Sequence, residues 1–187
     1  MLGADFSEVL QEAARGDEAA FARLWRDNQP PLLRFVRVLA SESAEDVASE
    51  VWLEIARGLD RFRGGEPEFR SWLFTMARRR VVDLRRYAAR RPATVTSDLR
   101  DLDQPSPGDA ATAALEQIST EAALELIATL PREQGEIVAL RVIAGLDVAY
   151  VAEIVGKRPG TVRVASHRAL RTLAATLSAA ADQEATR

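Results

Sequence analysis

The chain has 187 residues and a net charge of −3, and 47% of its residues are hydrophobic and 28% charged, as in a soluble globular protein of one or two domains. Cysteine is absent and there is one histidine, which excludes disulfide bonds, thiolate or histidine-rich metal sites and a cysteine nucleophile. No apolar run reaches the roughly 20 residues that span a bilayer, and the acidic N-terminus is unlike a signal peptide. We therefore expect a cytoplasmic protein without membrane insertion and without a cofactor.

The first half of the chain predicts four helices, because apolar residues recur with a helical period and β-branched alternation is missing. Asp17 is placed to cap a helix to about residue 28, and Pro30 and Pro31 are expected to break it and start the next helix, to about residue 40. Residues 43–46 resemble a capping box, which predicts a third helix to about Gly58. A glycine loop then precedes a long helix over about residues 68–89.

A segment rich in proline and acidic residues, 92–112, predicts a flexible linker between two halves. Further helices are expected over about residues 113–129, from Pro131 to near Gly145, from Asp147 to a turn at Gly156, and from Pro159 onward. The predicted fold is therefore all-α, with two small helical domains, residues 1–91 and 113–187, joined by a flexible acidic linker.

Basic residues are concentrated in two blocks. Eight arginines stand against one aspartate over residues 70–91, and residues 156–171 hold one lysine and four arginines with no acid. Residues 96–113, between these blocks, hold four aspartates against one arginine. This pattern favours two contacts with a polyanion, and solvated helix faces are the alternative.

The last two expected helices have the helix-turn-helix pattern, in which the second helix enters the major groove of DNA. A helical wheel places Val162, Ala165, Ser166, Ala169, Leu170 and Leu173 on the packing side. Arginine can read guanine through two hydrogen bonds, and an exposed helix of an ordinary bundle is the alternative. The candidate DNA-binding residues are Arg158, Gly160, Thr161, Arg163, Val164, His167, Arg168 and Arg171.

Aromatic residues alternate with arginines in the first basic block, where Trp72, Phe74 and Tyr87 lie among the cations. Such a mixture suits unpaired bases, whose faces stack on aromatic rings for about 1–3 kcal/mol each. Residues 72, 76, 79, 83 and 86 align at helical spacing. The alternative is that Trp72 and its neighbour Phe69 are core residues.

The helix after Ser43 has an outward stripe opposite four residues that are expected to pack inward, Val47, Val51, Ile55 and Leu59. The stripe consists of Asp46, Ser49, Glu50, Leu53 and Arg57. An acidic stripe with an exposed leucine can dock on a partner's basic helix, or it can be an ordinary solvated face.

These features, in this order, resemble the extracytoplasmic-function sigma factors, the small two-domain initiation factors of RNA polymerase within the sigma-70 family. The resemblance extends from about Asp17 to Leu177. It rests on "DRFRG" and "FRSWL" in the first half and on "LP", "VAEIVG", "GTVR" and "HRAL" in the second.

The resemblance implies that residues 1–91 are sigma domain 2, which docks on the clamp helices of core RNA polymerase and opens the −10 promoter element. It implies that Asp46, Ser49, Glu50 and Leu53 make the docking contact, and that the glycine loop before the long helix holds a base flipped out of the DNA. The implied −10-binding residues are Gly64, Gly65, Glu66, Trp72, Arg78, Arg79, Asp83 and Arg86. Residues 113–187 are implied to be sigma domain 4, which binds the −35 element through the candidate residues above and also contacts the polymerase flap. An anti-sigma factor is implied as a further partner.

Other classes of protein fit less well. A stand-alone helix-turn-helix regulator would bind duplex DNA without polymerase, and it would leave the aromatic and arginine block and the acidic stripe without a role. An enzyme is not expected, because the sequence has no paired-carboxylate metal site, no nucleophile with a base and no phosphate-binding glycine loop. A purely structural helical adaptor is the remaining alternative.

Overall fold

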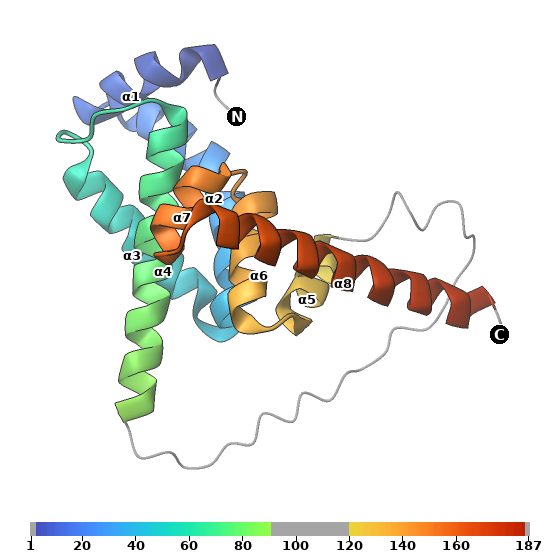
Figure 1. The fold of residues 1–187 in the computed structure, drawn as a ribbon. Coiled ribbons are helices and arrows are strands. Elements are labelled where there is room, and N and C mark those ends of the chain that lie inside the picture. The colour runs from blue at the N-terminus through green and yellow to red at the C-terminus, as the bar shows by residue number, and fades with distance from the viewer. Residues whose placement is uncertain (1–2, 91–119, 186–187) are drawn as a thin grey trace.

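The computed structural model describes residues 3–90 and 120–185, and every regular element in these two ranges is helical. The N-terminal bundle, residues 3–90, contains short 3₁₀ turns over Gly3–Asp5 and Ser41–Ser43 and four helices, α1 (Phe6–Ala14), α2 (Glu18–Ala40), α3 (Ala44–Gly58) and α4 (Glu66–Arg90) (Figure 1). The C-terminal bundle, residues 120–185, contains α5 (Thr120–Thr129), α6 (Arg132–Val138), a π-helical turn over Ala139–Ile143, α7 (Val148–Val155) and α8 (Pro159–Ala185). The predicted all-α class is confirmed, whereas the predicted linker over 92–112 and the expected helical residues 113–119 lie outside the described residues.

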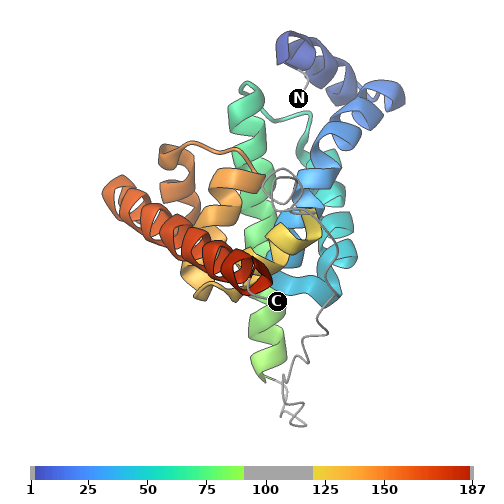
Figure 2. The same cartoon turned by 90° about the vertical axis from the view of Figure 1, so that its right-hand side faces the viewer.

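The core of the N-terminal bundle lies between α2, α3 and α4, which contact one another pairwise. Phe35 of α2 and Phe74 of α4 are fully buried there, and their rings meet edge to face with centroids 5.3 Å apart. The four residues that were predicted to pack inward, Val47, Val51 and Ile55 of α3 and Leu59 directly after it, are all buried. Helix α1 packs on α2 at the end of the bundle opposite the C-terminus of α4 (Figure 2).

The predicted break at Pro30 and Pro31 is wrong, because α2 continues through both residues. A proline inside a helix removes a backbone hydrogen bond and costs about 3 kcal/mol or more. Leu24 and Leu32, on either side of the prolines, are fully buried, and burying such a side chain contributes about 1.5–3 kcal/mol. Asn28, also buried, donates its Nδ2 to the carbonyl of Leu24 at 2.9 Å. Tertiary packing on both sides therefore keeps the helix continuous through a local sequence that favours a break.

The predicted helix starts at Asp17 and Ser43 agree with the structure in position, and only the first agrees in its capping chemistry. The Asp17 carboxylate caps α2 by accepting a hydrogen bond from the backbone N–H of Ala20 at 2.7 Å. Ser43 precedes α3, but its side chain makes no capping hydrogen bond, so the predicted capping box is wrong. A capping residue needs an extended backbone, whereas Ser43 ends a 3₁₀ turn with φ −112° and ψ 15°.

The C-terminal bundle contains the predicted helix-turn-helix in α7 and α8. Gly156 ends α7 with a φ of 69°, a left-handed conformation that glycine adopts without strain, and Pro159 begins α8. Val162 and Ala169 of α8 are fully buried, as predicted, but Leu170 is 47% exposed, so its predicted packing is wrong. The reason is that Leu170 lies about 100° around the helix from Ala169, at the edge of the face that Val162, Ala169 and the partly buried Leu173 turn toward the bundle.

The two bundles pack against each other. Helix α2 contacts α5, α6 and the π-helical turn, and α4 contacts α7. Figure 1 shows α7 against the upper half of α4, where the two helices are in contact. Among the helices of the described residues, none combines the length and apolar character needed to cross a membrane.

We predict that Phe74→Ala destabilises the protein by about 3–5 kcal/mol, because it leaves a cavity beside Phe35 in the core. Urea unfolding followed by circular dichroism measures this change. Leu84→Ala is a control in the same helix, where the side chain is 39% exposed, and it should cost less than about 1 kcal/mol. Equal losses in the two variants would contradict the assignment of Phe74 to the core.

Candidate nucleic-acid and polymerase interfaces

The predicted −35 residues form one exposed surface on α8 and the turn before it. All eight, Arg158, Gly160, Thr161, Arg163, Val164, His167, Arg168 and Arg171, are exposed. The buried Val162 and Ala169 hold the opposite face of α8 against the bundle. No described carboxylate pairs with any of the four arginines, whereas the nearby Lys157 pairs with Glu133 at 2.8 Å. The surface therefore offers four uncompensated cations and small side chains to a ligand.

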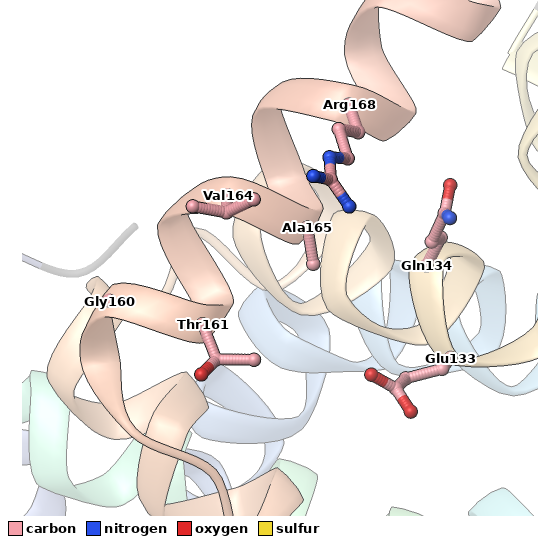
Figure 3. Close-up of a pocket in the computed structure, with 7 residues that line it drawn as sticks. All are labelled: Glu133, Gln134, Gly160, Thr161, Val164, Ala165 and Arg168. Atoms are coloured by element: carbon pink, nitrogen blue, oxygen red, sulfur yellow. The ribbon is translucent and has the colours of Figure 1, made fainter.

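A hollow of about 450 Å³ lies between the first turns of α8 and the start of α6. It is lined by Gly160, Thr161, Val164, Ala165 and Arg168 from α8, together with Glu133 and Gln134 from α6. Figure 3 shows the side chains of Arg168 and Gln134 directed toward the space between the two helices. Sequence reasoning did not identify Glu133 and Gln134, and the available signal was the polar run directly after Pro131, at the predicted start of a helix.

The predicted base-holding loop is a tight turn ahead of α4. Gly64 has a φ of 148°, and a Cβ added there would lie 2.8 Å from Cβ of Glu68, so only glycine fits. The N–H of Gly65 donates to Oε2 of Glu68 at 2.9 Å. Glu66 accepts a hydrogen bond from the backbone N–H of Gly3 at 3.2 Å. Glu68 and Gly3, which sequence reasoning did not single out, therefore hold the turn in place.

Aromatic rings form a wall beside this turn. The Phe62 and Trp72 rings stack with centroids 5.1 Å apart and an interplanar angle of 14°. Phe69 is fully buried and contacts both rings, and the buried Phe6 of α1 contacts Phe69 from the other side. Phe69 is thus a core residue, as the alternative interpretation held, and so is Phe74. Trp72, which that interpretation also placed in the core, is half-buried against it, and Tyr87 is 61% exposed.

The cations of α4 do not all lie on one surface. Arg79 and Arg86 are exposed, and Arg86 lies 3.8 Å from Asp83. Arg78, predicted to bind the same DNA element, instead pairs with Glu136 of α6 in the C-terminal bundle. The structure therefore keeps Arg79, Asp83 and Arg86 open to solvent and separates Arg78 from them.

Two further contacts join the bundles. Arg70 is 8% exposed, and its Nε and Nη2 donate to the carbonyl of Ala144 at 3.1 and 2.9 Å. Tyr150 of α7 donates its hydroxyl to Oε1 of Glu68 at 2.5 Å. That hydrogen bond is the main cause that lowers the pKa of Glu68, with backbone N–H donors assisting, and the same bond raises the pKa of Tyr150.

The predicted docking stripe on α3 is fully available. Asp46, Ser49, Glu50 and Leu53 are exposed, with Leu53 at 56%. Arg80 of α4 lies 3.4 Å from Glu50 and also pairs with Glu54, so the negative charge of the stripe is partly compensated. Among the described residues, no group of three or more acidic or histidine side chains is placed to hold a metal ion.

Both bundles match protein families that are already described, in sequence and in fold. Residues 24–91 match Sigma-70 region 2, and residues 120–173 match Sigma-70, region 4. The ECF RNA polymerase sigma factor SigD of Mycobacterium tuberculosis is 34% identical over 188 residues, which cover 97% of this chain and 88% of SigD. The ECF RNA polymerase sigma factor BldN of Streptomyces coelicolor is 33% identical over 171 residues, 89% of this chain and 64% of BldN, so the chain spans less than two thirds of BldN. A chain in the structure of CnrH in complex with the cytosolic domain of CnrY has the same fold, with a TM-score of 0.61 and 22% identity over 93% of this chain and 97% of that one.

Region 2 followed by region 4 defines the sigma-70 class of transcription initiation factors. Within that class, the chain belongs to the extracytoplasmic-function sigma factors, as its identity to SigD over nearly its whole length shows. Factors of this group direct promoter-specific initiation by RNA polymerase, and they are not enzymes. The stand-alone regulator is therefore not favoured.

We predict that Tyr150→Phe raises the pKa of Glu68 toward its ordinary value, because a donor to the ionised carboxylate is lost. The pKa should stay below the ordinary value, since the N–H of Gly65 still donates to the same carboxylate. A carboxyl ¹³C NMR titration of Glu68 measures the shift.

The lowered pKa of Glu68 makes the stability of the fold depend on pH. A depressed carboxyl pKa means that the Glu68 contact stabilises the fold above the pKa of the unfolded chain and is lost as the pH falls through the folded value. Ala149→Ser, at an exposed α7 position beside Tyr150, is the control and should leave the Glu68 titration unchanged. Identical titrations of wild type and Tyr150→Phe would contradict the contact.

Proposed function

We propose that this sigma factor brings core RNA polymerase to promoters through three separate surfaces: the α3 stripe for polymerase, the turn and outer face of α4 for the −10 element, and α8 for the −35 element. The observation that carries the proposal is the exposed surface of α8 and the turn before it, whose four arginines have no described carboxylate partner. Such a face suits DNA, because neutralising phosphates releases counterions.

For the −35 element, α8 acts as the recognition helix. Arg163 and Val164 lie in its first turns, where a recognition helix meets base edges, and Arg158, Arg168 and Arg171 suit phosphates. Gly160 and Thr161 have small side chains where the start of α8 would enter the major groove. His167 is placed for a phosphate contact. Gln134, across the hollow from Arg168, extends the same surface onto α6.

For the −10 element, the turn at Gly64 and Gly65, with Glu66, holds a base extruded from the non-template strand. Extruding a base costs a few kcal/mol, and stacking on an aromatic ring offsets part of this cost. Trp72 is half-buried, and one face of its ring is already stacked on Phe62. Arg79, Asp83 and Arg86 continue this surface along α4, and Arg78 joins it only when its pairing with Glu136 is released.

For polymerase, the stripe of Asp46, Ser49, Glu50 and Leu53 docks on the clamp helices, and the C-terminal bundle contacts the flap. An exposed leucine within an acidic stripe favours a helical partner with basic side chains. Sigma domain 2 is assigned to residues 1–91, the linker to 92–112 and sigma domain 4 to 113–187, in keeping with the matches over 24–91 and 120–173. The protein then acts in the cytoplasm, where polymerase and chromosome are found.

An anti-sigma factor is proposed as a further partner. CnrH, whose structure has the same fold, is bound by the cytosolic domain of CnrY. The exposed apolar residues Leu53 and Val164, which the proposal assigns to polymerase and DNA, would also suit a competing protein.

Run-off transcription tests the proposed function. Purified protein and bacterial core polymerase are incubated with a pool of promoter fragments, and start sites that need the protein are mapped. Start sites that share −35 and −10 elements support the proposal. Tight binding to duplex DNA without polymerase, and no initiation, would favour a stand-alone regulator instead.

We predict that Arg163→Ala weakens −35 binding by about 1–3 kcal/mol and relaxes the preference at one base pair, because the side chain lies free in the first turns of α8. Holoenzyme binding to a set of single-base −35 variants measures both effects. Lys157→Ala is the control, since Lys157 already pairs with Glu133 and should leave the preference unchanged. A loss that is uniform over all variants would mean that Arg163 contacts only phosphate.

We predict that Glu50→Arg abolishes binding to core polymerase, because it replaces an acid in the centre of the α3 stripe with a cation beside Arg80. A pull-down or fluorescence titration with core polymerase measures the loss, and circular dichroism checks that the fold is retained. Glu12→Arg makes the same charge change at an exposed position of α1 and should bind normally. Unimpaired binding by Glu50→Arg would show that the stripe is not the docking surface.

A further inference from the structure

We propose that a hollow between the two bundles binds the terminal phosphate group of a small molecule, held by Arg85 and Arg132. The hollow has a volume of about 220 Å³ and lies where the end of α2 meets α4, α5 and α6. Each of these helices contributes to its walls, with Leu39, Arg85, Ile127, Arg132 and Glu136 among the lining residues. None of the residues assigned above to promoter DNA or to the α3 stripe lines it. The inference therefore goes beyond the proposed function and needs no polymerase.

The two arginines bring like charges to one small space. Arg85 of α4 is half-buried, and Arg132 is the first residue of α6. Burial is the main cause that lowers the pKa of Arg85, and the nearby charge of Arg132 lowers that pKa further. Two guanidinium groups that repel each other are stabilised when an anion lies between them. The hollow therefore has the electrostatic character of an anion site.

The protein compensates only part of this positive charge. Glu136, the acid among the lining residues, already pairs with Arg78 of α4, so three arginines share one carboxylate. Arg85 donates its Nη2 to the carbonyl of Leu39, which is uncharged. Within the described residues, Arg132 pairs with no carboxylate. Since an arginine has five N–H donors, both side chains keep donors for a ligand.

A terminal phosphate group fits this hollow in charge and in size. It carries a charge of about −1.5 to −2 near pH 7 and has three acceptor oxygens, which arginines bind through paired hydrogen bonds. A phosphate within a nucleic-acid strand carries one charge, and it has a sugar on each side. A hollow walled by four helices admits the end of a small molecule more readily than the middle of a strand. We therefore assign free phosphate or a small phosphorylated molecule to it, and not DNA.

The helices that form the walls pack closely. A Cβ added to the buried Gly135 would lie 3.0 Å from the carbonyl oxygen of Ile127, so α6 and α5 are in near contact at the hollow. Arg85 is tied to the end of α2 by its hydrogen bond to Leu39. A preformed site loses little conformational entropy when a ligand binds. The bound ligand links α4 to α6 and stabilises the fold by mass action.

Isothermal titration calorimetry on the full chain tests the site, with inorganic phosphate, pyrophosphate and ATP as separate probes at one ionic strength. We expect Arg132→Gln to weaken binding about tenfold or more, because charge-assisted hydrogen bonds to the phosphate group are lost. Arg132 is exposed, so this change leaves the core intact. Arg15→Gln removes the same charge from an exposed position at the end of α1, and as the matched control it should bind like wild type.

Glu136→Gln gives a test of the opposite sign. The change removes a negative charge from the wall of the hollow and keeps the size of the side chain, so binding should tighten about threefold. Loss of the pairing with Arg78 also leaves a further cation without a partner near the ligand. Damage to the fold would weaken binding instead, and circular dichroism checks that each variant is folded.

The probe that binds most tightly identifies the source of the phosphate group, free phosphate or a nucleotide, and either result supports the site. No binding by any of the three probes overturns the inference. Equal weakening by Arg132→Gln and Arg15→Gln also overturns it, since anions would then be attracted to basic surfaces in general. Sodium acetate that binds as tightly as phosphate would mean a carboxylate site, which contradicts the assignment. Because polymerase and DNA are absent from the titration, these outcomes are independent of whether the protein initiates transcription.

Discussion

The buried guanidinium of Arg70 is the interaction on which the arrangement of the two bundles depends. A charged group that leaves water loses many kcal/mol of hydration, and hydrogen bonds from the protein must offset this loss. Here the acceptors come from two segments far apart in sequence, Asn28 in α2 and Ala144 after the π-helical turn. Since neither acceptor alone satisfies the guanidinium, the charge makes the docking of the bundles specific in a way that apolar contacts between α2 and α5 would not.

Helix α4 serves three environments because a helix turns by 100° per residue. One side builds the core with Phe69, Leu73, Phe74 and Val81, a second faces the C-terminal bundle, and a third is left to solvent. Arginine suits all three, since its stem packs against apolar surface while its planar head bonds a carbonyl, a carboxylate or a phosphate. This explains why so dense a basic block occurs in a chain whose net charge is negative, and why its cations are not equivalent.

The sequence predicted those features that depend on a single helix. The period of apolar residues identified Val47, Val51 and Ile55 as buried and the seven −35 residues within α8 as exposed, because exposure follows from the side of the helix on which a residue lies. The chemistry of single residues was also enough to predict the cap at Asp17 and the turn at Gly156. Leu170 was misplaced because the packing side drawn on the wheel was wider than the face of α8 that the bundle covers.

Features set by distant contacts could not be predicted in this way. The continuation of α2 through Pro30 and Pro31 depends on burial by other helices, which no local rule contains. Arg78 was assigned to DNA with its neighbours, yet its partner Glu136 is 58 residues further along the chain, and Tyr150 is 82 residues from Glu68. A block of like charges in the sequence suggests one role for all its residues. The fold shows which of them pair within the protein and which remain exposed.

Helix α1 lies before residue 24, where the match to region 2 begins, and this sets a limit on how the protein can be divided. Phe6 is buried against Phe69, Gly3 holds Glu66, and Asp5 lies 3.4 Å from Arg23. A fragment cut at the boundary of the matched region would uncover Phe69 and release the aromatic wall from one side. The smallest self-sufficient unit of this half of the molecule is therefore longer than the segment by which its family is recognised.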